Sequence, residues 1–133
     1  MKIEIPIKPL SINAAHEGRH IKTKEFLRYE KNISFLLPIC PIDIKDGEYF
    51  VKYVFYVKNY KMSDTGNFEK LITDLLVKRG YLKDDRFIKA MYLEKVKVKD
   101  TQDEKIVLDI VPYNVRYEIL QNERGSAHTA GAL

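Results

Sequence analysis

Alternating apolar and polar residues predict four β-strands along the chain. Over residues 2–8 every second residue is an isoleucine, and Pro6 places this strand at a sheet edge or ends it early. The clearest alternation covers residues 49–60, where one face is apolar and the other mixes apolar residues with lysines. Further strands are predicted over 87–99 and 105–111.

Apolar residues at helical spacing predict two helices between these strands. The first covers residues 24–37 and stops before Pro38, which cannot continue a helix. The second follows a break at 63–66, carries one apolar stripe and ends near Gly80. The order strand, helix, strand, helix, strand, strand predicts an α+β fold, with a mixed β-sheet covered by two main helices.

The length of the chain is that of a single domain. It has 133 residues, of which 45% are hydrophobic, so we expect one packed core. Residues 1–120 are expected to form this domain. Residues 121–133 are interpreted as a disordered C-terminal tail or an appended remnant, because their final stretch is small and unpatterned.

The charge of the chain is compatible with a nucleic-acid partner. There are 23 Lys and Arg against 19 Asp and Glu, a formal net charge of +4, and positive charge concentrates near phosphate; many soluble domains carry a similar charge. Lys95, Lys97 and Lys99 share one face of a predicted strand, where they either follow a DNA backbone or protect a solvated sheet edge.

The compartment expected from the sequence is the cytoplasm. Cys40 is the single cysteine, so neither an internal disulfide nor a multi-cysteine zinc site is available, which indicates a reducing environment. Charges interrupt the apolar residues at the N-terminus, so we expect no signal peptide. No run approaches the roughly 20 apolar residues of a membrane span, so no membrane partner is expected.

Polar residues gather at the two ends of the second predicted helix. On an ideal helix Asn67, Lys70 and Asp74 lie within about 60° of one another, opposite the apolar stripe. This face either points at a ligand or is plain solvated surface with Lys70 and Asp74 paired. Beyond the helix come Asp84 and Asp85; a helix of this length spans about 20 Å, so acids at its two ends meet only if neighbouring strands carry them back.

Both clusters resemble the core of the RusA family of Holliday junction resolvases (crossover junction endodeoxyribonucleases). The matching residues are Ser63-Asp64-x-Gly66-Asn67-x-x-Lys70, then Asp74, then Gly80-Tyr81-Leu82-x-Asp84-Asp85. The family pattern is approximately D-x-D-N-x-x-K, an acid within the helix, then G-aromatic-hydrophobic-x-D-D. Near the N-terminus, Ser11-Ile12-Asn13 before a basic loop resembles the family's S-x-N element. The resemblance covers about residues 3 to 111.

The resemblance implies a RusA-like fold and a homodimer that binds four-way DNA junctions. Such an enzyme nicks symmetrically opposed strands by Mg²⁺-dependent hydrolysis, with Mn²⁺ as a possible substitute, in a bacterial or phage-infected cell. By position, Asp64 and Asp85 correspond to metal-binding, catalytic acids, and Lys70 to the catalytic lysine. The DNA-binding residues implied are Asn13, Arg19, His20, Lys22, Lys24, Asn67 and Lys70.

One position departs from the family pattern, because Gly66 stands where the second acid is expected. Glu69 is an imperfect substitute, since on an ideal helix it points about 100–160° away from Asn67, Lys70 and Asp74. Asp84 is therefore the preferred replacement ligand.

Gly66 leaves three outcomes open for the chemistry: a rebuilt metal site, a weaker enzyme, or a protein that binds DNA junctions without cutting them. A basic interaction domain unrelated to DNA is a further alternative to the enzyme.

Overall fold

The computed structural model describes residues 1–10, 23–37, 47–62 and 65–115, which form one small α+β domain. Its helices and strands are β1 (Lys2–Ile5), α2 (Lys24–Leu36), β2 (Tyr49–Val57), α3 (Thr65–Lys78), β3 (Ile88–Lys97) and β4 (Lys105–Pro112). Short 3₁₀ turns include η1 (Tyr60–Met62) after β2 and η2 (Asp85–Phe87) before β3. Within these described ranges, no helix is long and apolar enough to cross a membrane.

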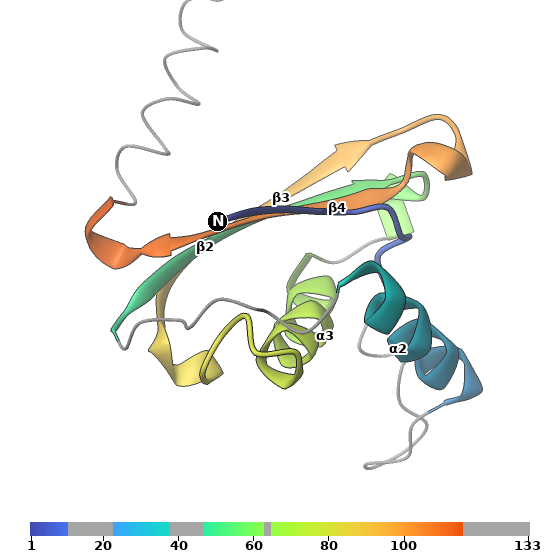
Figure 1. Cartoon of the computed structure of the whole chain (residues 1–133). Coiled ribbons are helices and arrows are strands. Elements are labelled where there is room, and N and C mark those ends of the chain that lie inside the picture. Colours follow the sequence, from blue (N-terminus) through green and yellow to red (C-terminus); the bar gives the residue numbers. More distant parts are fainter. Residues whose placement is uncertain (11–22, 38–46, 63–64, 116–133) are drawn as a thin grey trace, which may run out of the picture.

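The four strands form one mixed sheet in the order β1-β4-β2-β3. Strand β4 is antiparallel to both β1 and β2, whereas β2 and β3 are parallel and are connected through α3. Figure 1 shows α2 and α3 on the same side of the sheet. The expected α+β class, mixed sheet and two main helices are confirmed.

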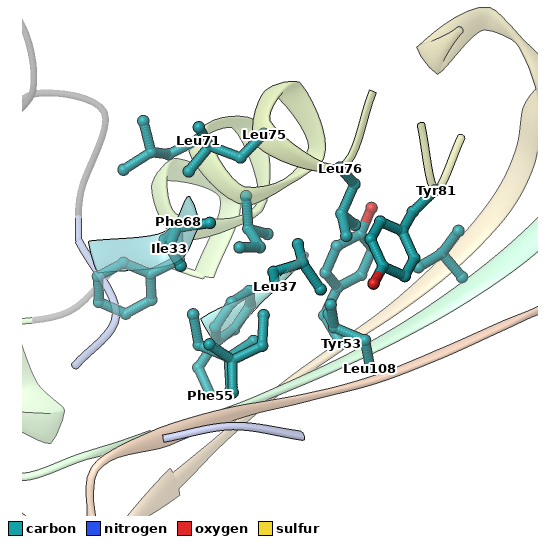
Figure 2. Close-up of a cluster of buried hydrophobic side chains, with 14 of the residues drawn as sticks. Ile33, Leu37, Tyr53, Phe55, Phe68, Leu71, Leu75, Leu76, Tyr81 and Leu108 are labelled. Carbon is teal, nitrogen blue, oxygen red and sulfur yellow. The ribbon is translucent and has the colours of Figure 1, made fainter. Parts of the chain in front are cut away.

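The hydrophobic core lies between the sheet and the two helices. Tyr53 and Phe55 of β2 are fully buried on the face that the helices cover, and Ile33 of α2 and Leu76 of α3 pack against the same cluster (Figure 2). Burying each such side chain contributes on the order of 1.5–3 kcal/mol. Every second residue of β2 belongs to this cluster, and this alternation fixes which face of the strand meets the helices.

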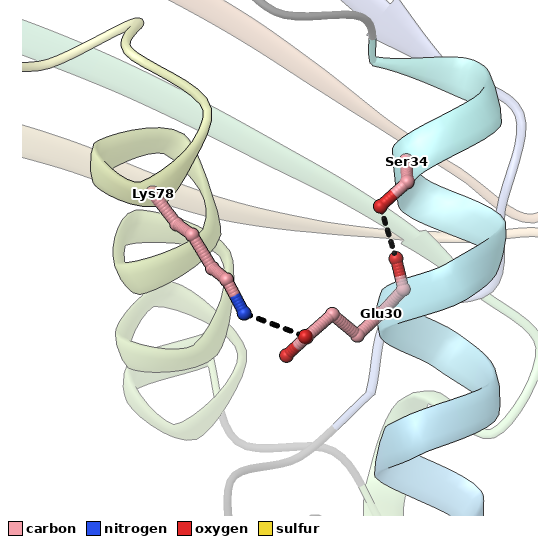
Figure 3. Close-up of polar contacts among 3 residues, drawn as sticks. All are labelled: Glu30, Ser34 and Lys78. Carbon is pink, nitrogen blue, oxygen red and sulfur yellow. Dashed lines mark hydrogen bonds and ion pairs between the residues drawn. The ribbon is translucent and has the colours of Figure 1, made fainter.

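Two side chains at the end of α3 make polar contacts with α2. Lys78 Nζ lies 2.6 Å from Glu30 Oε1 in the middle of α2 (Figure 3). Within α2, the Ser34 hydroxyl donates to the Glu30 carbonyl at 3.0 Å. Arg79 Nε donates to the carbonyl of Leu37, the residue that caps α2, at 3.0 Å. A cation therefore satisfies a carbonyl that the end of α2 leaves without a helical partner.

The end of α3 fixes the direction of the chain into β3. Gly80 has φ +83°, a left-handed conformation that costs glycine little, and the N–H of Tyr81 returns to the Leu76 carbonyl at 2.8 Å. Tyr81 and Leu82 are then buried in the core. This closure confirms the expected helix end near Gly80, and it brings the following acids, Asp84 and Asp85, to the start of β3.

Candidate active site

A pocket of about 440 Å³ lies between α3 and the beginning of β3. It is lined by Glu69, Lys70, Thr73 and Asp74 from α3, and by Asp85, Ile88 and Met91 from η2 and β3. Two residues given catalytic roles from the sequence, Lys70 and Asp85, therefore line the same pocket. Because Lys70 and Asp74 are exposed while the apolar stripe of α3 faces the core, this helix face borders an open concave surface.

The parallel pairing of β2 and β3 brings Asp85 to α3. The register pairs Tyr49 with Ile88, so β3 starts level with the start of β2. Since α3 runs back from the end of β2 to the start of β3, Asp85 meets the middle of this helix. The parallel pairing of these two strands, which the sequence left open, is present. Asp64, the intended partner of Asp85, lies outside the described residues, so the meeting of the two acids stays a prediction.

Asp84 has a local role at the start of η2. Its carboxylate accepts a hydrogen bond from the Arg86 N–H at 3.0 Å and lies 3.7 Å from Arg86 Nε. The backbone hydrogen bond from Arg86, followed by a side-chain hydrogen bond with Asp85, lowers the pKa of the Asp84 carboxyl. Asp84 does not line the pocket, but it directly precedes Asp85, which does. Its role as replacement ligand stays a prediction.

Glu69 also lines the pocket, although on an ideal helix its side chain points about 100–160° away from Asn67, Lys70 and Asp74. The Thr73 hydroxyl, one turn further along α3, donates to Glu69 Oε1 at 2.9 Å. Thr73 also contacts the buried Tyr53 hydroxyl at 2.6 Å. Because a carboxylate only accepts, the single Thr73 proton goes to Glu69, and Tyr53 donates to Thr73. A buried chain of hydroxyls thus orients Glu69, which ideal helical angles alone do not reveal.

The other predicted residues are placed away from the pocket or are not described. Asn67 is half-buried in the first turn of α3 and is not among the lining residues. Lys24 is exposed in the first turn of α2, where Thr23 Oγ1 accepts from the Phe26 N–H. Five predicted site residues lie outside the described ranges: Asn13, Arg19, His20, Lys22 and Asp64.

Gly66 belongs to the first turn of α3. Its backbone is helical, a conformation that aspartate also adopts, so the missing side chain is a chemical difference and not a requirement of the backbone.

The pocket offers ligand chemistry that suits magnesium, but not a complete set of acids. Carboxylate oxygens are what hard divalent cations prefer, and Mg²⁺ is often held by one or two carboxylates with waters. Among the residues that the structure describes, no three acidic, histidine or cysteine side chains lie close enough to hold an ion. Glu69 and Asp85 fit as a partial donor set, which waters or a further acid would complete.

Sequence reasoning missed Thr73 and Tyr53 as parts of this site. The available signal was Thr73 itself, a hydroxyl in a buried stretch of α3, four residues after Glu69, which is the spacing of helical neighbours. Tyr53 gave no signal, because its position in β2 is equally typical of a core residue.

Comparison with protein-family models and with curated proteins finds no match for this chain. The likeness to RusA-type resolvases therefore rests on the motif residues between Ser63 and Asp85 and on the N-terminal Ser11-Ile12-Asn13 element.

Proposed function

We propose that this protein is a structure-selective endodeoxyribonuclease that resolves four-way DNA junctions by metal-dependent hydrolysis at the pocket between α3 and β3. The observation that carries the proposal is the pocket itself, which gathers Lys70 and Asp85 with the additional carboxylates of Glu69 and Asp74. A lysine beside several acids in an open pocket is an arrangement that suits phosphodiester chemistry.

The residues of the pocket divide the chemistry among them. Asp64 and Asp85 would hold the cation, with Glu69 supplying the carboxylate that Gly66 lacks and Asp84 next to Asp85. When bound, Mg²⁺ would supply a Lewis acid and a water of lowered pKa. Lys70 would stabilise the negative charge that builds on the phosphate during cleavage. The Thr73 hydroxyl keeps the Glu69 carboxylate turned into the pocket.

Recognition of the junction would depend on shape and charge more than on base sequence. A homodimer would place two pockets so that opposed strands are nicked symmetrically. Lys24 and Asn67, with Asn13, Arg19, His20 and Lys22, would contact phosphates, since contacts of this kind position a protein on DNA without reading its sequence. The formal charge of +4 supports such binding.

A synthetic four-way junction with labelled arms tests this proposal. We expect the protein to cut it in Mg²⁺ or Mn²⁺, and Lys70→Ala to slow cleavage about 100-fold or more, because a charge-stabilising group is lost. Asp85→Asn should bind the junction and fail to cut it. Asp103→Asn, an exposed acid in the turn before β4, is the matched control and should cut normally. Normal cleavage by Asp85→Asn would show that the site is misassigned.

A junction-binding protein without catalysis is the second candidate. Gly66 favours it, together with the lack of three converging acids among the described side chains. Tight, salt-sensitive junction binding without cleavage would support it. Gly66→Asp then tests whether a lost ligand prevents cleavage, since aspartate also adopts the helical backbone of this position, and circular dichroism shows whether the variant keeps the fold. A gain of cleavage in this variant would show that the missing acid limits the chemistry.

A further inference from the structure

The turn that follows β2 forms a second pocket, separate from the candidate active site. Its volume is about 230 Å³, and it is lined by Lys58, Asn59, Tyr60, Lys61 and Lys97. Two hydrogen bonds anchor the turn: the Val98 N–H donates to the Val57 carbonyl at 3.0 Å, and the Lys58 N–H donates to Glu104 Oε2 at 3.2 Å. The lysines therefore stand on a fixed backbone. We call this surface the lysine pocket.

The Tyr60 ring in the lysine pocket contacts a lysine and remains partly exposed. Lys95 Nζ lies 4.2 Å from the centre of the Tyr60 ring and donates to the Tyr60 carbonyl at 2.7 Å. Tyr60 nevertheless remains 41% exposed. The cation–π contact and the hydrogen bond act on the same residue, so they limit how far the ring can turn. The result is a flat, partly ordered surface available to a ligand.

The three lining lysines have no acidic partner among the residues that the structure describes. Within the part of the chain that the structure describes, no carboxylate forms an ion pair with Lys58, Lys61 or Lys97. Glu104 is the acid that anchors the turn, but it is buried and accepts its hydrogen bond from the backbone N–H of Lys58, not from a lysine side chain. Three exposed ammonium groups around one pocket attract an anion with several phosphates.

We infer that the lysine pocket binds a DNA strand, with the ammonium groups on successive phosphates and an unpaired base stacked on Tyr60. Proteins that bind single strands combine a positive groove with aromatic side chains on which bases stack. An acidic peptide would use the lysines but gain nothing from the ring. The inference deepens the proposed function and rests on it for the choice of DNA as the partner.

The lysine pocket and the candidate active site lie along the same side of β3. Met91 and Lys97 pair with Val51 and Val57, which belong to the core beneath the helices, so both face the helix side of the sheet. Six residues of strand separate them, about 20 Å at 3.3 Å per residue. At about 3.4 Å per nucleotide along a duplex strand, this is roughly six nucleotides. A strand held at Tyr60 thus reaches the pocket that contains Met91.

Fluorescence anisotropy with a labelled single-stranded oligonucleotide and a duplex of equal length, both without metal, tests the inference. Tyr60→Ala should weaken single-strand binding about tenfold and duplex binding much less, because stacking requires an unpaired base. Tyr60→Phe should bind like the parent protein, since the ring is retained. Lys58→Gln/Lys97→Gln should lower the slope of log affinity against log salt by about 1.5.

A control pair and the cleavage assay separate this inference from the proposed function. Lys2→Gln/Lys31→Gln removes the same charge from exposed positions on β1 and α2, and should leave the salt slope nearly unchanged. If the parent protein cuts junctions while Tyr60→Ala and Lys58→Gln/Lys97→Gln bind normally, the lysine pocket is misassigned and the nuclease stands. If both variants lose single-strand affinity in a protein that never cuts, the pocket stands and the nuclease fails. No DNA binding by the parent protein overturns both.

Discussion

The chain of hydroxyls behind Glu69 gives a sharp test of the structure. Tyr53 is fully buried and Thr73 is 3% exposed, and their hydroxyl oxygens lie 2.6 Å apart. Thr73→Val keeps the shape of the side chain but removes the acceptor of the Tyr53 proton. The Tyr53 hydroxyl would then be buried without a partner, which costs about 1–3 kcal/mol. Tyr53→Phe removes the Tyr53 hydroxyl itself, so no buried donor is left without a partner, and the free energy of unfolding should fall by about 1 kcal/mol.

A double-mutant cycle read by urea unfolding measures this coupling. Tyr53→Phe/Thr73→Val leaves neither hydroxyl unsatisfied, so we expect it to cost less than the sum of the single changes by about 1 kcal/mol or more. Circular dichroism follows the unfolding transition, and equal slopes against urea show that the variants unfold from the same structure. Additive effects, or a cost below about 0.5 kcal/mol for Thr73→Val, would refute the buried chain.

Three further predictions concern the stability of the fold. Gly80→Ala should lower the free energy of unfolding by about 1–2 kcal/mol, because φ is +83° while the space around a new Cβ is empty; a stabilised variant in urea would contradict this. Lys78→Ala should cost about 1 kcal/mol or less, since the Lys78 side chain is exposed while that of Glu30 is only partly so, and raising the salt concentration should shrink this effect. Burial raises the pKa of the Tyr29 and Tyr53 hydroxyls above their usual value of 10.0, so the folded protein keeps protons that the unfolded chain releases. Stability should be complete below pH 10 and should fall above it by about 1.4 kcal/mol per pH unit for each tyrosine, as urea titrations would show, and Tyr53→Phe should remove one of the two contributions.

Local patterns were enough to locate the helices and strands, but not their ends. Strand β1 stops at Ile5, the early end that Pro6 had indicated, because proline has no N–H to offer the ladder. The alternation of apolar and polar residues extends to Tyr60, but strand β2 stops at Val57. The chain then turns into η1, to which Tyr60 belongs. Helix α3 was bounded well, since Gly80 supplies the left-handed closure that ends a helix.

Long-range pairing could not be obtained from these patterns. Alternation shows which face of a strand is buried but not which strand lies beside it, so the parallel β2–β3 pair and its effect on Asp85 needed the structure. The same limit applies to Glu69, whose orientation depends on a hydroxyl contact between Tyr53 and Thr73, two residues 20 positions apart in sequence. Residue types and spacing located the candidate site, and tertiary contacts decided which acids enter it.

The pairing of the first strand with the last has a consequence for how the chain folds. Lys2 pairs with Asp109 and Ile5 with Ile106, so β1 finds its partner only after more than one hundred residues. Closing such a long loop is entropically costly and slows folding relative to local contacts. During synthesis, β2, α3 and β3 are complete before β4 emerges from the ribosome. The first strand therefore has no partner in the sheet until translation of the domain is nearly finished, and this interval is when the nascent chain is most exposed to aggregation.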